Sequence, residues 1–429
     1  MNTTAEKLFD LIEKGGSPYQ VVEEAEKRLK EAGFEKLEFH TAWGLTGGKS
    51  YYMIHHGTTL IAFTIPKTLY YRESFRMAAA HTDFPCLRIK PNPEMEMSGY
   101  QQLNVEVYGG AILNTWLDRP LGIAGKVALA SDKVFAPRIV HFSSECPVAV
   151  IPNIAIHMNP ALNKGVELNK QKDMIPIIGI AGEEMQKKDF FYEYLAKELQ
   201  LSKEEILDFD LYLYNTEMPE TVGMGKELIS APRLDNLTSV QALLDGIITG
   251  EREDGINLIA LFDHEEIGSR TKQGAGSMLL RDVVEKIQIS LGRDACQVKE
   301  ALYQSMLLSV DVAHAMHPNQ NQKADVTNQP VLNRGFCIKE SGNQSYATDC
   351  EVVAIVEQIC KKEMIAYQKY VNRSDIAGGS TLGAIAGSLM PVQTVDIGVP
   401  ILAMHSAREL MGADDMAALS RFVGSYFSI

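Results

Sequence analysis

The stretch Asn257-Leu-Ile-Ala-Leu-Phe-Asp-His-Glu-Glu266 joins a strand-like apolar run to an acidic cluster. A short apolar run of this kind is typical of a strand buried on both faces of a parallel sheet. In open α/β sheets, ligands bind beyond the carboxyl ends of the strands. The stretch therefore predicts an α/β fold with a polar site where the strand ends.

The rest of the chain's C-terminal half alternates strand-like and helical patterns. Strands are expected at Ser305–Val310 and Thr394–Val399, and helices at Ser239–Ile248, Met278–Leu291, Cys350–Tyr367 and Ala407–Phe422. The N-terminal region adds helical text in residues 3–32, split at Gly15-Gly-Ser-Pro18, and strands at Tyr51–Ile54, Thr59–Thr64 and Phe75–His81. Such alternation predicts a mainly parallel sheet flanked by helices.

Residues 93–231 have a different character. Leu103–Tyr108 alternates polar and apolar residues as a half-exposed strand does, and Gly125–Ala130 and Arg138–Phe142 are also strand-like. One helix is expected near Glu183–Leu199. We therefore expect a β-rich domain at 93–231, inserted into a catalytic domain formed by 1–92 and 232–429.

Composition narrows the class of protein. The 429 residues carry a formal net charge of −14, which argues against binding to a nucleic-acid backbone, since that needs a basic face. The N-terminus lacks the pattern of a signal peptide, and no uncharged apolar run approaches the ~20 residues of a membrane helix. None of the six cysteines forms a C-x-x-C pair, so reduced thiols and a cytoplasmic location are expected.

Five polar clusters share one property: each lies where a predicted strand ends or a helix begins. They are His81-Thr-Asp83, Asp263-His-Glu-Glu266, Asp311-Val-Ala-His314, Met404-His-Ser406 and Arg233-Leu-Asp-Asn236. Together they would bring imidazoles and carboxylates to one edge of the sheet. This set suits a hydrolytic site with two divalent ions, zinc, manganese or cobalt, in which one carboxylate bridges the ions.

The adjacent Glu265 and Glu266 suggest a division of labour. In an extended segment neighbouring side chains point to opposite faces, so one glutamate is expected to bind metal and the other to act as a base. Asp83 lies two residues from His81, and we expect its carboxylate to accept the second ring N–H of a metal-binding histidine.

Each cluster also has a simpler explanation. Asp263–Glu266 alone fits a solvated acidic loop, His81 a buried histidine, Asp235 a helix cap, and Asp311 and His405 ordinary loop residues. The prediction of a metal site depends on their joint occurrence at the ends of predicted elements.

Several stretches resemble the aspartyl aminopeptidase family, metallopeptidase family 18, in its bacterial form. They occur in the family's order over most of the chain and include Ala80–Pro91, Tyr100–Gly110, Thr115–Leu121, Ile154–His157, Ala231–Asn236, Asp263–Ser269, Asp311–Asn319, Asn343–Thr348 and Ala403–Glu409.

The resemblance implies a role for each matching residue. His81 and Asp311 would hold one ion, Glu266 and His405 the other, with Asp235 bridging and Glu265 as the general base. His157 would bind substrate in a neighbouring subunit's site, although a metal-binding role for it is the alternative. Lys339 and Tyr346 match residues near the substrate, and His264 receives no role.

The same resemblance implies an enzyme with two zinc ions, a dizinc aminopeptidase-like catalytic domain and an inserted dimerisation domain in a tetrahedral homododecamer. It would remove N-terminal residues, with acidic residues preferred, from peptides. A dimetal deacylase of amino-acid conjugates and a non-catalytic assembly protein that retains the fold are the alternatives. No nucleic-acid or membrane partner is expected.

Overall fold

Four parallel strands form the centre of the larger body of the molecule, in the order β13 (Gly255–Phe262), β4 (Ser74–His81), β14 (Met306–Val310) and β18 (Gln393–Gly398). The computed structural model describes residues 3–69, 73–144, 146–181, 189–376 and 378–429. All four strands are buried along nearly their whole length, as their apolar sequences predict.

The edges of this nine-stranded sheet are mixed in direction in the described part of the chain. The full order is β1 (Glu35–Lys36), β2 (Ser50–His55), β3 (Thr59–Thr64), β13, β4, β14, β18, β16 (Phe336–Glu340) and β17 (Tyr367–Val371). β2 and β3 form an antiparallel hairpin joined by residues 56–58, in which His56 and Gly57 both adopt positive φ.

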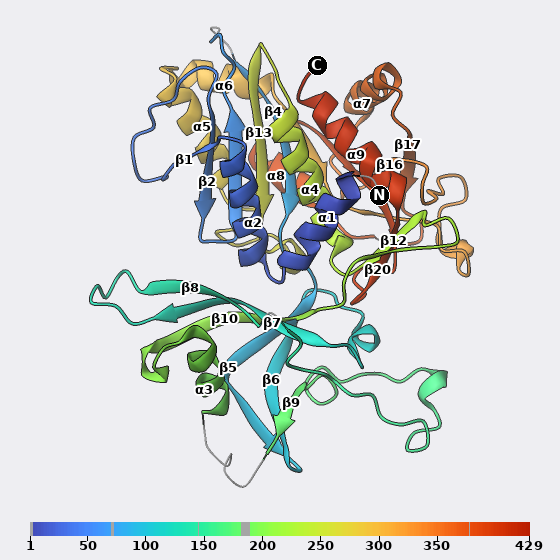
Figure 1. The fold of residues 1–429 in the computed structure, drawn as a ribbon. Helices are drawn as coiled ribbons and strands as arrows, with labels where there is room; N and C mark the ends of the chain where they lie inside the picture. The colour runs from blue at the N-terminus through green and yellow to red at the C-terminus, as the bar shows by residue number, and fades with distance from the viewer. Residues whose placement is uncertain (1–2, 70–72, 145, 182–188, 377) are drawn as a thin grey trace.

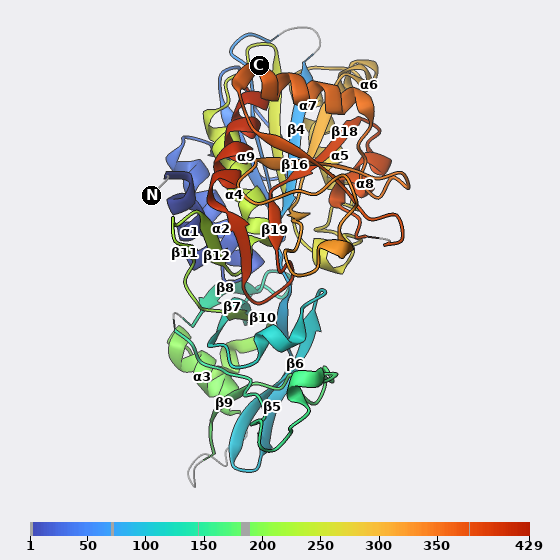
Figure 2. The same cartoon turned by 90° about the vertical axis from the view of Figure 1, so that its right-hand side faces the viewer.

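Helices cover both faces of the sheet, as Figures 1 and 2 show. One face carries α1 (Thr3–Lys14), α2 (Pro18–Glu31), α4 (Leu234–Thr249), α7 (Cys350–Glu363) and α9 (Ala413–Tyr426), and the other α5 (Leu279–Ser290), α6 (Ala295–Tyr303) and α8 (Leu382–Leu389). Each face has its own buried apolar layer. None of the described helices is long and apolar enough to cross a membrane.

A second sheet makes up the smaller body, in the lower part of Figure 1. Its six antiparallel strands lie in the order β8 (Arg138–Ser143), β7 (Leu121–Leu129), β10 (Ile206–Asn215), β5 (Cys86–Met97), β6 (Tyr100–Tyr108) and β9 (Ile177–Ile180). Helix α3 (Phe190–Leu199) packs against this sheet, where the ring of its Phe191 contacts the ring of Phe209 in β10. The expected β-rich insertion is present, while its boundaries at 93 and 231 stay a prediction.

A small third sheet lies beside the junction of the two bodies. It has the order β11 (Glu220–Val222), β12 (Leu228–Ala231), β20 (Glu409–Gly412), β19 (Pro400–Leu402) and β15 (Ala313–His314). Short 3-10 helices complete the described elements: η1 (Leu113–Trp116), η2 (Leu162–Lys164), η3 (Lys203–Glu205), η4 (Glu265–Ile267) and η5 (Asn321–Lys323).

Three predicted helices end or begin elsewhere. The helix expected from Ala407 starts only at Ala413, because Glu409–Gly412 pairs with β12 and β19 as strand β20. The helix expected to reach Tyr367 ends at Glu363, where Met364 turns into the left-handed region. The helix expected from Glu183 is seen from Phe190, and residues 182–188 lie outside the described residues.

Candidate active site

The ends of the central strands carry the first two site residues. His81 is the last residue of β4 and Asp311 directly follows β14. The parallel register places His81 opposite Phe262, so the acidic cluster after β13 begins next to it. β4 continues almost directly into β5 of the smaller body, so this edge of the large sheet faces the smaller body.

Glu265 and Glu266 lie in a turn and not in the extended segment that the sequence suggested. They open the 3-10 helix η4, which is flanked by His264 and Gly268, both at positive φ. Gly268 makes the sharp turn that its lack of a side chain predicts. The turn still separates the two glutamates, since only Glu266 joins a compact group of potential ligands with His81 and Asp235.

Asp235 and His405 both follow strands of the third sheet, β12 and β19. Asp235 lies at the start of α4, where its backbone and that of Asn236 are not yet helical. His405 follows β19 in a loop and has a φ of 66°. Neither position is a plain strand end, so contacts with other segments must hold both residues in place.

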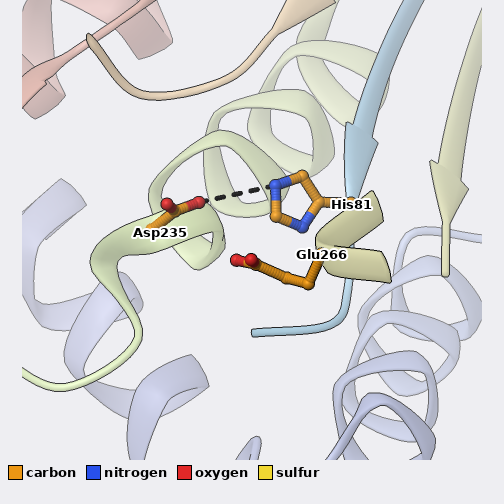
Figure 3. Close-up of side chains that lie close together, drawn as sticks. All are labelled: His81, Asp235 and Glu266. Atoms are coloured by element: carbon orange, nitrogen blue, oxygen red, sulfur yellow. Dashed lines mark ion pairs between the residues drawn. The ribbon is translucent and has the colours of Figure 1, made fainter. Parts of the chain in front are cut away.

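Asp235 stands between two matching pairs of side chains. Its Oδ1 lies 3.4 Å from Nε2 of His81, and its Oδ2 lies 3.5 Å from Nε2 of His405. On one side, Nε2 of His81 is 3.5 Å from Oδ1 of Asp311. On the other, Nε2 of His405 is 3.5 Å from Oε2 of Glu266. Figure 3 shows His81, Asp235 and Glu266 pointing toward one another from β4, α4 and η4.

These residues have the properties of a site for divalent cations. The ligand atoms of His81, Asp235 and Glu266 all lie within 4.8 Å of one another. Oδ1 of Asp235 and Oε1 of Glu266 are buried and accept no hydrogen bond from the described part of the chain. Buried carboxylate oxygens without donors are costly unless a cation binds them, so the set fits a metal centre.

The charges of the site lead to the same conclusion. Burial, followed by the charges of nearby carboxylates, raises the pKa of Glu265 to about 8 and that of Glu266 well above its usual range. Burial opposes the charged form of His405, but its hydrogen bond with Asp235 raises its pKa to about 9. Crowded carboxylates that repel one another are stabilised when cations lie between them.

Asp83 connects His81 to the two glutamates. Its Oδ1 lies 3.3 Å from Nδ1 of His81, although that ring nitrogen is closer, at 3.0 Å, to the backbone oxygen of Asp83. The carboxylate accepts the backbone N–H groups of Glu265 and Glu266, each at 3.1 Å, and the hydroxyl of Tyr108 at 2.7 Å. Asp83 therefore fixes both the imidazole and the turn.

Glu409 is a site residue that sequence reasoning missed. Its buried carboxylate accepts the backbone N–H of Asp235 at 3.0 Å and that of His405 at 2.8 Å. The signal was its position four residues after His405, inside a stretch already matched to the family. Its effect on the backbone of a distant aspartate could be seen only in three dimensions.

The three expected substrate residues lie in different surroundings. Lys339 is only 2% exposed and donates to the backbone oxygens of Asp311 and Val312, both at 3.0 Å, with its ammonium above the ring of Tyr346. Tyr346 is buried beside it. His157 is exposed in a turn of the smaller body and is not among the residues gathered in the site of one chain.

His264 is not among the grouped ligands and contacts other residues. Its Nδ1 lies 2.8 Å from Oγ1 of Thr271, and its Nε2 lies 3.3 Å from Oδ2 of Asp263. These contacts account for His264 as a residue that stabilises the turn before η4.

Comparison with known proteins identifies the fold. The model of the family described as aminopeptidase I zinc metalloprotease (M18) matches residues 11–427. The chain is 43% identical over 412 residues to a "Probable M18 family aminopeptidase 2" of Clostridium novyi, covering 96% of this chain and 95% of the relative.

Solved structures agree with this match. A chain described as part of the Ape4 and Nbr1 complex superposes with a TM-score of 0.95 at 30% identity, covering 99% of this chain and 85% of that one. A chain of the S. cerevesiae mApe1 dodecamer gives a TM-score of 0.86 at 26% identity, covering 99% and 96%. Sequence, fold and site agree that this chain belongs to the M18 family of zinc aminopeptidases, which are exopeptidases that remove N-terminal residues.

Proposed function

We propose that this aminopeptidase holds two zinc ions in the paired arrangement around Asp235. His81 and Asp311 would bind one ion, His405 and Glu266 the other, and Asp235 would bind both. The observation that carries the proposal is the symmetry of the site, with each oxygen of Asp235 within 3.5 Å of a different imidazole. Cobalt or manganese would fit the same mixture of nitrogen and oxygen ligands.

Glu265 is the proposed general base. When bound, the ions would polarise the substrate carbonyl and lower the pKa of the attacking water. Glu265 lies next to the ligands but outside their compact group, and burial raises its pKa to about 8, which makes its ionised carboxylate a stronger base. Its carboxylate can therefore take a proton from the attacking water and return it to the leaving amine. Asp83 would keep His81 in one tautomer through the ring nitrogen that faces away from the metal.

The site also offers space for a substrate residue. A hollow of about 310 Å³ lies beside it, lined by residues that include His314, Met316, Tyr370, Ile401 and Ala403. This volume is in the usual range for small-ligand pockets. We propose that the side chain of the peptide's N-terminal residue enters here, while Tyr346 and Lys339 border the site from Asp311's side.

A preference for acidic N-terminal residues stays a prediction with Lys339 as its cation. The ammonium of Lys339 already donates hydrogen bonds to two backbone oxygens, and its Nζ lies 3.7 Å from Oδ2 of Asp311. A substrate carboxylate would have to approach the remaining N–H of a nearly buried group. Lys339→Met, compared with the unaltered enzyme on acidic and neutral substrates, would show whether the preference depends on this charge.

Assembly and location are proposed on separate grounds. A tetrahedral homododecamer would place the exposed His157 of one subunit within reach of another subunit's site, and one similar protein is described as a dodecamer.

All six cysteines are free, as expected for a protein of the reducing cytoplasm.

A substrate panel with metal-reconstituted protein tests the proposed function. We expect release of N-terminal residues from aminoacyl-arylamides, loss of this activity with a chelator, and recovery when zinc is restored. The deacylase alternative predicts hydrolysis of N-acyl amino acids instead, and the assembly protein predicts neither activity.

A further inference from the structure

The smaller body sends one short segment, residues 108–112, into the active site. β6 ends at Tyr108, and the two glycines that follow, Gly109 and Gly110, carry the chain past the metal-binding residues to Ile112. Tyr108 remains paired with Cys86 of β5, so the start of the segment is fixed to the second sheet. Residues of the larger body provide all the proposed metal ligands, and this segment of the smaller body contacts two of them, Glu266 and His405.

His405 is held by this segment at two points. Nδ1 of its ring lies 3.2 Å from the backbone oxygen of Gly110. Its backbone oxygen accepts the N–H of Ile112 at 3.0 Å. The ring contact orients Nε2 toward Asp235 and Glu266, because a histidine that donates from Nδ1 offers the lone pair of Nε2 to a metal.

The two glycines are required by this close approach. A Cβ on Gly110 would lie 3.0 Å from Nδ1 of His405, and one on Gly109 would lie 3.1 Å from Cβ of Glu266. Gly109 also has a φ of 73°, which favours glycine. Any larger side chain at either position would push against a residue that we assign to the same ion.

Tyr108 extends the contact to Asp83. Its hydroxyl donates to Oδ2 of that carboxylate at 2.7 Å, and the same oxygen accepts the backbone N–H of Glu266. Hence Tyr108, Gly109, Gly110 and Ile112 together touch the surroundings of Glu266 and His405. Asp83 also lies beside His81, with its Oδ1 3.3 Å from Nδ1 of that ring, so Tyr108 acts on both halves of the site, whereas the contacts described for Gly109, Gly110 and Ile112 are with Glu266 and His405.

We propose that residues 108–112 position the His405–Glu266 half of the metal site, so that binding of the second ion depends on the contact between the two domains. Tyr108 and Gly110 are positioning residues, because they act through Asp83 and His405. The inference deepens the two-ion proposal and rests on it.

Zinc titration of the full-length, metal-stripped protein in competition with a chromophoric chelator tests this inference. In Gly110→Ala, we expect the first zinc to bind as in the unaltered protein and the second to bind about 10–100-fold more weakly, as for other residues that orient metal ligands. Tyr108→Phe keeps the ring and removes only the hydroxyl, so it provides a second test if Gly110→Ala fails to fold. We expect it to weaken the second zinc about tenfold and the first zinc less, because Asp83 contacts both the backbone of Glu266 and the ring of His81.

Two matched variants serve as controls. Tyr212→Phe also removes a tyrosine hydroxyl. The ring of Tyr212 packs with its centroid 5.8 Å from that of Tyr108, and among the described hydrogen bonds its hydroxyl has none to Asp83. Gly342→Ala adds a methyl group where no atom lies within 4 Å. Both should bind two zinc ions with unchanged affinities. Second-site affinities within twofold of the unaltered protein in Gly110→Ala and Tyr108→Phe, or equal weakening of both ions in Gly110→Ala, would overturn the inference. A single zinc in the unaltered protein would instead overturn the two-ion proposal.

Discussion

The two halves of the proposed metal site have the same donor atoms but different surroundings. Each half offers one imidazole and one carboxylate and shares Asp235. The side chains of His81 and Asp311 are 1% and 13% exposed, whereas in the other half Glu266 is 2% exposed and His405 is 33% exposed. The first pair lies at the ends of two neighbouring parallel strands. The second depends on a loop, a buried glutamate and a segment from the other domain.

This difference predicts that the two ions exchange at different rates. Enclosure and the rigid ends of β4 and β14 should retain the ion at His81 and Asp311. Lys339 acts against this, because its charge lies 3.7 Å from Oδ2 of Asp311 and lowers the attraction for a cation. We expect enclosure to decide the order of release, since water and chelator must reach an ion before it can leave.

The largest effect should follow from removing the carboxylate that both halves share. Asp235→Asn keeps the shape of the side chain and removes its charge, so both ions should bind more weakly and hydrolysis should fall below the level of every variant described next. Metal analysis after dialysis and an arylamide assay measure the two effects. Asp132→Asn, on an exposed hairpin, is the control. Full retention of either ion in Asp235→Asn would show that the halves are independent.

Changing Glu265 should separate catalysis from metal binding. Glu265→Gln should lower kcat by about 10²–10⁴-fold, the usual contribution of a general base, while both ions remain. The comparison of kcat with zinc content checks this. Near-normal turnover would contradict the assignment of Glu265 as the base, and loss of zinc would make it a ligand.

Glu409 tests the support of the weaker half. In Glu409→Gln, one of the two backbone N–H groups, of Asp235 or of His405, would face an amide NH₂ in place of a carboxylate oxygen. We expect about 10–100-fold weaker binding of the second zinc and a smaller effect on the first. Competition titration measures both affinities. A larger loss at the first ion would reverse the proposed order of the halves.

The smallest expected effect is the change in zinc affinity over a single unit of pH. Without zinc, the pKa values of about 9 for His405 and about 8 for Glu265 mean that both hold protons at pH 7. Zinc requires the neutral imidazole, so binding should release protons and become tighter as pH rises from 6 to 9. Calorimetry in buffers of different ionisation enthalpy gives the number of protons released. Proton uptake on binding would contradict these protonation states.

The half of the site at the ends of β4 and β14 is also the half that sequence patterns predict best. His81 and Asp311 follow directly from buried apolar runs, since parallel strands of known order bring their carboxyl ends together. Their placement needs only local pattern and the general geometry of α/β sheets. In the structure Nε2 of His81 lies 3.4 Å from Oδ1 of Asp235 and 3.5 Å from Oδ1 of Asp311.

The supports of the other half could not be derived in this way. Residues 407–412 have a helical pattern, yet strand pairing with β12 and β19 determines their structure and places Glu409 beneath His405. The contact between Gly110 and His405 joins residues 295 positions apart. No local preference encodes such a contact, so the role of the 108–112 segment emerges only from the folded chain.

Crystals of the zinc-loaded enzyme, soaked in chelator for increasing times, provide the most direct test of the comparison. Anomalous diffraction at the zinc edge would give the occupancy of each half separately. We predict two zinc peaks on either side of Asp235, with the peak beside His405 and Glu266 fading first. Earlier loss of the peak beside His81 and Asp311, or a single peak at full zinc loading, would contradict the account.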